Sequence, residues 1–262
     1  MPRPVTYLLV LALWGLAGSL QAEDVWQDPW HCDPVLMGLA DRITFQVTYE
    51  GDSMAPVMAT GEWDTRINGT PVFADGPFGR CVQAGGGSGI AVYPRGPNAT
   101  LSTMGAMSLW ICPVEWTHLN GGNTVFTKCT ASRFYVQRQG PGHDEAGKLT
   151  RHENLQFLML GDVTGNKVLA TSTVKWPLGK WRLVVANWSM PTMSLSVDGG
   201  EFKPTTVREV PQDDYFGDLM VGGVNGEITL LDEVTFYRRP LSLEEVRHLY
   251  ETFKPEDPEV EQ

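Results

Sequence analysis

Residues 226–251 constrain the fold of this chain more than any other stretch. They read G-E-I-T-L-L-D-E-V-T-F-Y-R-R-P-L-S-L-E-E-V-R-H-L-Y-E. The first half alternates in a way that predicts a half-buried strand, with one face formed by Ile228, Leu230, Asp232, Val234 and Phe236. This alternation places the carboxylate of Asp232 among four apolar side chains, where an isolated charge is costly.

The second half of this stretch predicts a short helix at residues 243–253. Pro240 ends the strand, and Ser242 and Glu245 form a capping box before an apolar run. Leu241 and Val246 occupy the positions of a hydrophobic staple. The apolar residues that follow recur at helical spacing, so we expect the helix to pack on a larger body.

Most of the remaining chain predicts short strands. Gly, Pro and Asn separate runs at residues 43–49, 89–93, 107–111, 124–128, 134–138, 155–160, 167–173, 181–188, 193–197, 218–221 and 228–237. Many short strands with one helix favour an all-β sandwich over alternating strands and helices. Residues 57–75 are expected to be irregular, and residues 139–150 to form a surface loop.

The two ends of the chain have a different composition. Residues 1–22 are typical of a signal peptide, with Arg3 before an apolar run that is too short to span a bilayer. We therefore expect a secreted, extracytoplasmic protein without membrane insertion. Residues 23–42 form an N-terminal extension, residues 43–253 one domain, and residues 254–262 an acidic disordered tail. The net charge of −11 disfavours nucleic acid as a partner.

Five segments in order carry a family resemblance. The ending at residues 226–251 is one, and the others are F-Q-V-T-Y-E-G at 45–51, G-A-M-S-L-W-I-C-P at 105–113, W-P-L-G-K-W at 176–181 and L-S-V-D-G at 195–199. Together they resemble the laminin-G-like domains of the concanavalin A-like lectin/glucanase superfamily, from about residue 43 to 251. The resemblance implies an antiparallel jelly-roll β-sandwich with one short C-terminal helix. Glu50 and Ser196 depart from the usual Asp and Tyr of that family.

The resemblance also implies a structural calcium ion. In that family the acid corresponding to Asp232 often helps bind calcium together with backbone carbonyls of the opening strand. Asp232 is therefore a candidate ligand, with Glu50 or a nearby carbonyl as a second one, and hard oxygen donors are the ligands that calcium takes. The alternative is a β-bulge that turns Asp232 to solvent, or a hydrogen bond to a loop amide.

Four cysteines, Cys32, Cys81, Cys112 and Cys129, follow the signal segment. An even number in a secreted chain suggests disulfides, with three possible connectivities. Cys112 and Cys129 lie in consecutive strand-like runs and would be bonded if those runs pair antiparallel. The alternative is that some are buried thiols.

Catalytic motifs are missing from the sequence. Glucanases of this superfamily carry E-x-D-x-x-E on one strand, and the nearest match begins at Glu62 but has Ile67 in place of the second Glu. Retaining glycosidases need two neighbouring carboxyl groups, so this match lacks the required pair. Trp63 and Trp116 adjoin polar loop residues and are candidates for stacking on a sugar, with core packing as the alternative.

These observations predict a secreted, non-catalytic recognition module that binds carbohydrate or a glycosylated surface. One alternative is a structural or adhesion module that binds protein. Another is a polysaccharide hydrolase or lyase of the same fold. Fold alone does not separate them, because function depends on sites built onto the fold.

Overall fold

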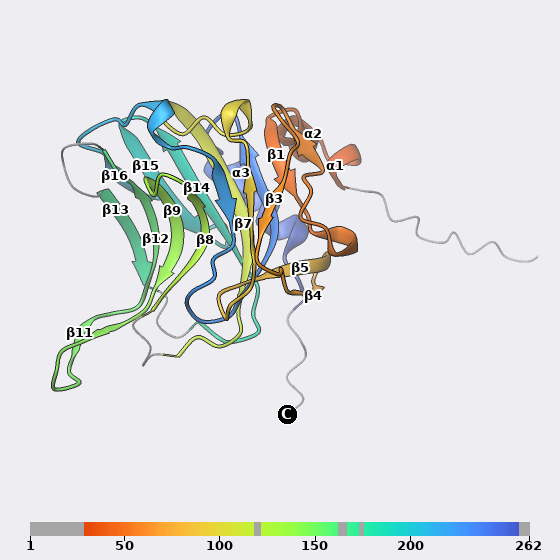
Figure 1. Cartoon of the computed structure of the whole chain (residues 1–262). Coiled ribbons are helices and arrows are strands. Elements are labelled where there is room, and N and C mark those ends of the chain that lie inside the picture. Colours follow the sequence, from red (N-terminus) through yellow and green to blue (C-terminus); the bar gives the residue numbers. More distant parts are fainter. Residues whose placement is uncertain (1–28, 118–121, 162–166, 173–175, 257–262) are drawn as a thin grey trace, which may run out of the picture.

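The computed structural model describes residues 29–117, 122–161, 167–172 and 176–256. Within these residues, two antiparallel sheets pack face to face as a sandwich (Figure 1). The signal segment and the end of the acidic tail lie outside the described residues, so the structure does not test what the sequence predicts for them. No helix in the described part of the chain is long and apolar enough to cross a membrane.

The sheet that we call the back sheet has nine strands. Its order is β16-β15-β14-β7-β18-β1-β2, and β5 pairs with β18 and β4. The strands are β16 (Lys203–Thr206), β15 (Thr192–Val197), β14 (Arg182–Ser189), β7 (Met104–Pro113), β18 (Thr229–Tyr237), β1 (Ile43–Val47), β2 (Met58–Ala59), β5 (Gly79–Ala84) and β4 (Phe73–Gly76).

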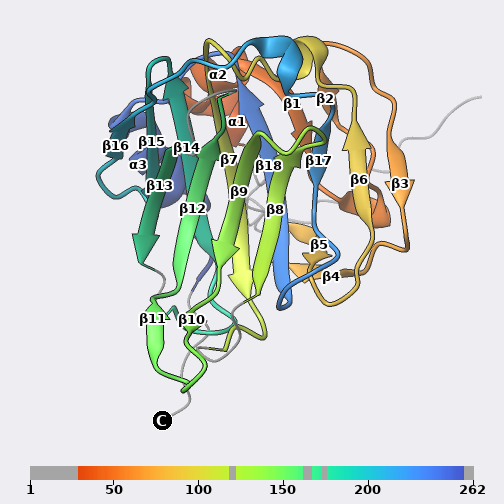
Figure 2. The same cartoon turned by 60° about the vertical axis from the view of Figure 1, so that its left-hand side comes forward.

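The other sheet, which we call the front sheet, has seven strands in the order β13-β12-β9-β8-β17-β6-β3. Figure 2 shows it facing the reader. The strands are β13 (Lys167–Ser172), β12 (Asn154–Met159), β9 (Phe134–Gln139), β8 (Asn123–Cys129), β17 (Leu219–Val221), β6 (Ile90–Tyr93) and β3 (Arg66–Asn68).

A two-stranded ribbon, β10 (Gly142–His143) and β11 (Leu149–Arg151), projects from the body beyond the ends of β9 and β12 (Figure 1). Residues 139–150 therefore contain a hairpin rather than a loop without structure. Residues 57–75, expected to be irregular, contain the short strands β2, β3 and β4.

The main core lies between the two sheets. Alternate side chains of each strand point inward, so apolar residues of both sheets interdigitate. Trp188 of β14 contacts Phe134, Phe157 and Phe236 with ring centroids 5.9–6.4 Å apart. Burial of such large rings supplies most of the hydrophobic driving force for this fold.

Helices cover the outer face of the back sheet. α3 (Leu243–Phe253) has the expected bounds, and Ser242 and Glu245 form the predicted capping box. A second, smaller core lies between the helices and the back sheet, and Leu241 and Val246 are both buried in it. α1 (Pro29–Cys32) and α2 (Pro34–Ala40) fold the N-terminal extension against this layer, which the sequence did not predict. The 3-10 turns are η1 (Glu50–Asp52), η2 (Gly96–Asn98) and η3 (Asp213–Tyr215).

Cys81, Cys112 and Cys129 are free thiols, and the expected bond between Cys112 and Cys129 is absent. Its premise was wrong because the two runs do not pair. β7, which carries Cys112, pairs with β14 and β18 in the back sheet, whereas β8, which carries Cys129, pairs with β9 and β17 in the front sheet. Burial raises the pKa of the Cys112 thiol to about 11.

Candidate functional site

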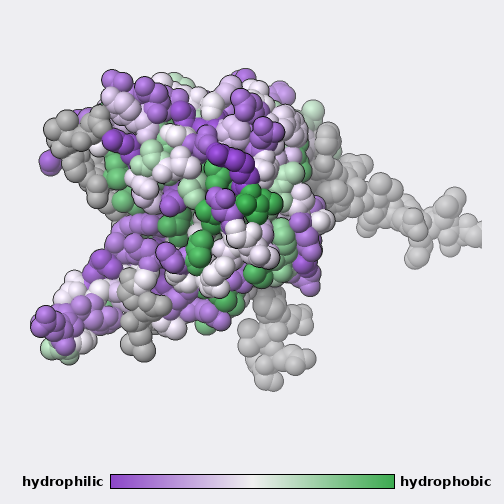
Figure 3. Space-filling view, viewed as in Figure 1, coloured by the Kyte–Doolittle hydropathy of each residue, from purple (hydrophilic) through white to green (hydrophobic). Residues whose placement is uncertain are grey.

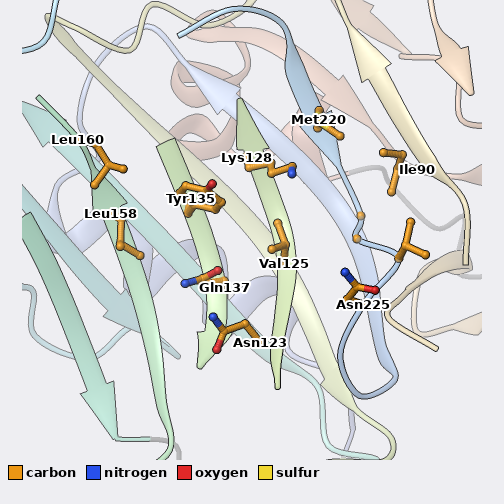
Figure 4. Close-up of a pocket in the computed structure, with 13 residues that line it drawn as sticks. Ile90, Asn123, Val125, Lys128, Tyr135, Gln137, Leu158, Leu160, Met220 and Asn225 are labelled. Carbon is orange, nitrogen blue, oxygen red and sulfur yellow. The ribbon is translucent and has the colours of Figure 1, made fainter. Parts of the chain in front are cut away.

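A shallow groove of about 520 Å³ crosses the outer face of the front sheet. Its walls come from β8, β9 and β12, and from the turn that follows β17 (Figure 4). The sheet builds this groove because every second residue of a strand points away from the core. The two sheets therefore use one set of side chains for the core and leave the other set for solvent or a ligand.

Amide side chains of β9 and β12 form a hydrogen-bonded ladder, of which Gln137 lines the groove. Gln137 Nε2 donates to Gln156 Oε1 at 3.0 Å, and Gln156 Nε2 donates to Gln139 Oε1 at 2.6 Å. Gln137 and Gln156 are buried, so these bonds fix the orientation of their amides. An amide offers donors and acceptors together, which suits it to hydroxyl groups.

The rest of the groove is mixed in character. Tyr135 and Leu158 offer apolar surface beside the ladder, while Lys128, Asn123 and Asn225 offer polar groups (Figure 4). The molecular surface seen in Figure 3 likewise shows apolar side chains gathered in the middle of a largely hydrophilic face. An aromatic ring flanked by hydrogen-bonding groups is an arrangement that suits a sugar, which has apolar ring faces and polar edges.

The two tryptophans predicted as sugar platforms are not brought together. Trp116 is buried, and its ring stacks between Phe126 and Trp176 at centroid distances of 6.4 and 5.7 Å. Its indole N–H donates to Thr229 Oγ1 at 2.7 Å. Trp116 is therefore a core residue, and its prediction as an open platform was wrong. Trp63 is 54% exposed but is not among the residues that line the groove.

A buried ion-pair network lies next to Trp116. Arg138 Nε donates to Glu153 Oε1 at 2.6 Å, and Arg138 Nη1 pairs with Glu227. The guanidinium carbon lies 4.9 Å from the centre of the Trp116 ring. Glu227 Oε1 accepts from the hydroxyl of Thr117 at 2.6 Å. We name Arg138, Glu153 and Glu227 the paired cluster, because its cation lies between the two carboxylates.

A second buried acidic group lies in the back sheet, where β18 has a β-bulge. The pairing of β18 with β7 shifts between Asp232 and Thr235, and Glu233 takes a φ of 51°. The bulge changes the parity of the strand: Leu231 faces the main core before it, and Val234 and Phe236 after it. The strict alternation expected through residues 228–236 was therefore wrong before the bulge, but Asp232 is fully buried as predicted.

Among the described residues, no Lys, Arg or His forms an ion pair with Asp232. Its Oδ1 accepts from the backbone N–H of Glu233 at 2.9 Å, and its Oδ2 has no hydrogen-bond partner. Burial and then the negative charge of Glu233 raise the pKa of Asp232 to about 8. Burial also raises the pKa of Glu233 to about 7, against the effect of a hydrogen bond from Gln46. The hydroxyl of Tyr49, another buried group nearby, also lacks a partner.

The structure brings Glu50 close to this site, as the sequence predicted. The negative charge of Glu50 contributes to the raised pKa of both Asp232 and Glu233. The β4–β5 turn packs over both candidate ligands: a Cβ on Gly76 would lie 2.8 Å from Asp232 Oδ2, and one on Gly79 would lie 2.4 Å from Glu50 Oε1. We name Asp232, Glu233 and Glu50 the unpaired cluster.

The chemistry of the unpaired cluster fits a hard cation. It offers carboxylate oxygens, one of them buried and without a partner, and lacks a resident positive charge. Among the described residues, however, no three His, Cys, Asp or Glu side chains are arranged to hold a metal ion. Backbone carbonyls and water would have to complete the coordination, as they commonly do for calcium.

Sequence reasoning missed the groove, the paired cluster and Glu233. The groove had one usable signal, the alternating glutamines of V-Q-R-Q at residues 136–139. No sequence signal pointed to the paired cluster, because its three members lie in different segments of the chain and become neighbours only when the sheet forms. Glu233 adjoins Asp232, but the bulge that buries both acids is invisible in a pattern of alternation.

Comparison with known proteins was made by sequence and by structure. Curated proteins gave no significant sequence match. A solved structure of the receptor-binding domain of botulinum neurotoxin mosaic serotype C/D superposes with a TM-score of 0.65 at 13% identity, over 82% of this chain and 51% of that chain. The binding domain of Paraclostridial Mosquitocidal Protein 1 gives a TM-score of 0.65 at 14% identity, over 82% and 53%.

A structure of botulinum neurotoxin type C gives a TM-score of 0.65 at 11% identity, over 84% of this chain and 53% of that chain. At such low identities these matches show a shared fold, and the chain spans about half the length of each neighbour. The family model described as concanavalin A-like lectin/glucanases superfamily matches residues 85–247, more than half of the sequence. Both sheets, the capped C-terminal helix and this match lead to one conclusion: the chain belongs to the concanavalin A-like lectin/glucanase superfamily.

Proposed function

We propose that this protein is a non-catalytic recognition module that binds carbohydrate, free or on a glycosylated surface, in the groove of the front sheet. The observation that carries the proposal is the amide of Gln137, which lines the groove beside the ring of Tyr135 and is oriented by a hydrogen-bonded ladder with Gln156 and Gln139. Pre-oriented amides bind hydroxyl groups without the entropic cost of ordering side chains on binding. The predicted signal segment at residues 1–22 is consistent with action outside the cytoplasm.

The structural neighbours add support of a limited kind. One is described as dependent on interaction with two ganglioside molecules, and another was solved in complex with SialylT. Because this chain matches only about half of each neighbour, their ligands do not identify its ligand. They support a recognition role for a protein of this fold.

Two alternatives make different demands on the structure. A protein-binding role is consistent with a neighbour solved in complex with rat synaptotagmin II. A hydrolase that acts through two carboxyl groups needs both beside the ligand, and none of the residues that line the groove is Asp or Glu. Binding without turnover is therefore the function that the groove supports best.

Screening the unaltered protein on a glycan array, and then titrating it with the glycans that bind, tests this proposal. We expect Tyr135→Ala and the double variant Gln137→Ala/Gln156→Ala each to weaken binding by about 5- to 30-fold, from loss of about 1–2 kcal/mol per ring or bonded pair. Leu178→Ala, an exposed apolar position outside the groove lining, should bind normally. Trp63→Ala tests the other predicted ring.

Three results would overturn the proposal. Binding that depends on Trp63 but not on Tyr135 or the glutamines would place the site elsewhere. An array without hits, together with capture of a protein ligand through the groove, would favour the adhesion alternative. Release of reducing ends or unsaturated products from polysaccharides, abolished by a single Asp or Glu substitution, would make the protein an enzyme.

We also propose that the unpaired cluster holds a structural calcium ion, with Asp232 and Glu50 as side-chain ligands. The support is the orphaned Oδ2 of Asp232, a buried oxygen to which a bound cation would give a partner. When bound, the ion would supply the positive charge that the described residues lack there. It would fix the η1 turn to β18 and so stabilise the back sheet.

A further inference from the structure

A second cavity, of about 570 Å³, lies on the opposite side of the molecule from the groove. α3 covers it on one side and the outer face of the back sheet forms its floor, with β7 and β18 contributing side chains. Trp30 of α1 and Phe78 of the β4–β5 turn complete its walls. Its volume falls in the range of pockets that hold small molecules. We name it the aromatic pocket.

Aromatic rings make the walls of this pocket. Trp30 stacks on Phe253 with ring centroids 5.5 Å apart. Phe78 meets Phe253 edge to face at 6.3 Å and Trp110 at 5.5 Å. Trp30, Phe78, Trp110 and Phe253 all line the cavity. Aromatic faces carry partial negative charge, so a cavity with four of them attracts a positive group.

The floor of the pocket carries a carboxylate that no cation neutralises. Glu233 lines the cavity, and its Oε2 accepts a hydrogen bond from Gln46 Nε2 at 2.9 Å. Within the described ranges no Lys, Arg or His forms an ion pair with it. Lys254 lies at the rim, but its ammonium pairs with Glu251 and stands 6.0 Å from the ring of Tyr250.

The backbone that presents this carboxylate is strained. Glu233 is in the left-handed region, with a φ of 51°, at the bulge of β18. That conformation is costly for a residue with a side chain, and such residues cluster at functional sites. The neighbouring polar groups are satisfied by each other, since Ser108 Oγ lies 3.2 Å from the hydroxyl of Tyr237. Glu233 is therefore the charged group of the floor that remains for a ligand.

We propose that the aromatic pocket binds a small organic ammonium ion, with its charge against Glu233 and its methyl or methylene groups against the rings. An anion is excluded by the carboxylate. A hard metal ion would gain nothing from the aromatic walls, because it takes oxygen ligands. A neutral ligand would leave Glu233 buried without a counter-charge, which costs free energy. The pocket and the groove lie on different sheets, so this proposal is independent of the carbohydrate proposal.

Calorimetric titration with choline, compared with its neutral isostere 3,3-dimethylbutan-1-ol, tests the proposal on the full protein in chelator. The two probes share shape and differ in charge. We expect choline to bind at least tenfold more tightly than the alcohol. Glu233→Gln should reduce choline to the affinity of the alcohol, and Phe78→Ala should weaken both probes. Glu201→Gln, an exposed acid outside the pocket, is the matched control.

The alcohol measurements separate loss of charge recognition from misfolding, because a folded Glu233→Gln protein should bind the alcohol at least as tightly as the unaltered protein does. Equal affinity for choline and the alcohol, or choline binding unchanged by Glu233→Gln, would overturn the proposal. Failure of both probes to bind the unaltered protein would overturn it as well. A glycan array without hits would overturn the carbohydrate proposal but not the ammonium proposal.

Discussion

The paired and unpaired clusters are two answers to the cost of buried charge. In the paired cluster, Arg138 forms ion pairs with both Glu153 and Glu227, and Thr117 donates hydrogen bonds to Glu227. In the unpaired cluster, Asp232 is buried near the half-buried Glu233 and the exposed Glu50, and among the described residues no cation pairs with them. Burial raises the pKa of Asp232 to about 8. The first is complete within the polypeptide, whereas the second needs a proton or an external cation.

This difference separates a structural site from a binding site. Both clusters have fully or nearly fully buried charged groups, Arg138 and Glu153 in one and Asp232 in the other, so burial alone does not distinguish them. What distinguishes them is whether the chain itself supplies the opposite charge. Breaking a satisfied buried pair is costly, while completing an unsatisfied one from solution is stabilising.

The largest effect is expected when the paired cluster loses its cation. Arg138→Met leaves two buried carboxylates without a counter-charge and should lower the free energy of unfolding by about 3–5 kcal/mol. Urea denaturation measures it. Arg66→Met, which breaks an exposed pair with Asp218, should cost less than about 1 kcal/mol. If the two variants lose the same stability, the paired cluster has no special role.

Calcium should stabilise the protein through the unpaired cluster. At about 100 times its Kd, a ligand that binds only the folded state adds about 2.7 kcal/mol, so the Tm should fall in chelator and recover with calcium. Asp232→Asn should abolish the response, and in chelator at pH 9 it should be more stable than the unaltered protein, because an amide carries no charge to desolvate. Asp218→Asn is the control. A Tm that is the same with calcium and with chelator would show that the unpaired cluster does not bind calcium.

The unpaired cluster should also give the apo protein an unusual pH profile. Because the folded-state pKa of Asp232 is about 8, above its ordinary 3.8, the folded protein holds this proton more tightly than the unfolded chain. In chelator, stability should therefore fall as pH rises from about 5 to 8, by on the order of 2 kcal/mol. Arg239 lowers the pKa of Glu245 to about 2, which has the opposite sign but acts only below pH 4.5.

Denaturation curves at each pH, with calcium and with chelator, check this profile. Calcium favours the ionised carboxylates, so its presence should flatten or reverse the slope. Asp232→Asn should flatten the slope in chelator. A wild-type curve in chelator that rises with pH through this window would show that Asp232 is not held protonated.

The smallest effect on stability is expected at Gly79, which packs against Glu50 of the unpaired cluster, with Gly87 as the control. Gly79→Ala and Gly87→Ala both place a side chain at a positive φ and should each cost about 1–2 kcal/mol. Only at Gly79 would the Cβ meet Glu50, at 2.4 Å, whereas nothing lies within 4 Å at Gly87. We therefore expect Gly79→Ala, and not Gly87→Ala, to weaken calcium binding severalfold in a titration followed by Tm. Equal calcium affinities would show that Glu50 is not a ligand.

Local patterns predicted the fold well. Ser242 and Glu245 fix the start of α3 by bonds three residues apart, so the sequence alone specifies them. Each of the expected strand runs contains a strand. The short strands β2, β3 and β4 went unrecognised because all their residues except Ala59 are exposed or half-buried and they lack an apolar alternation.

Long-range contacts were the part that the sequence could not supply. Cys112 and Cys129 are near in sequence, but β7 and β8 belong to different sheets, and this separation is set by the whole topology. Trp116 adjoins polar loop residues yet is enclosed by Phe126, Trp176 and Arg138, which come from three other segments. Asp232 was singled out from the pattern of its own strand, although a bulge interrupts the strict alternation on which that prediction rested.

The stacking of Trp30 on Phe253 ties the first described helix to the last. The two segments meet on the helical side of the back sheet, whereas the groove opens from the front sheet. A tether joined ahead of Trp30 or beyond Phe253 thus emerges on the far side from the groove. A molecule attached to a support next to Trp30 or Phe253 would therefore turn the groove, with Gln137, away from the support.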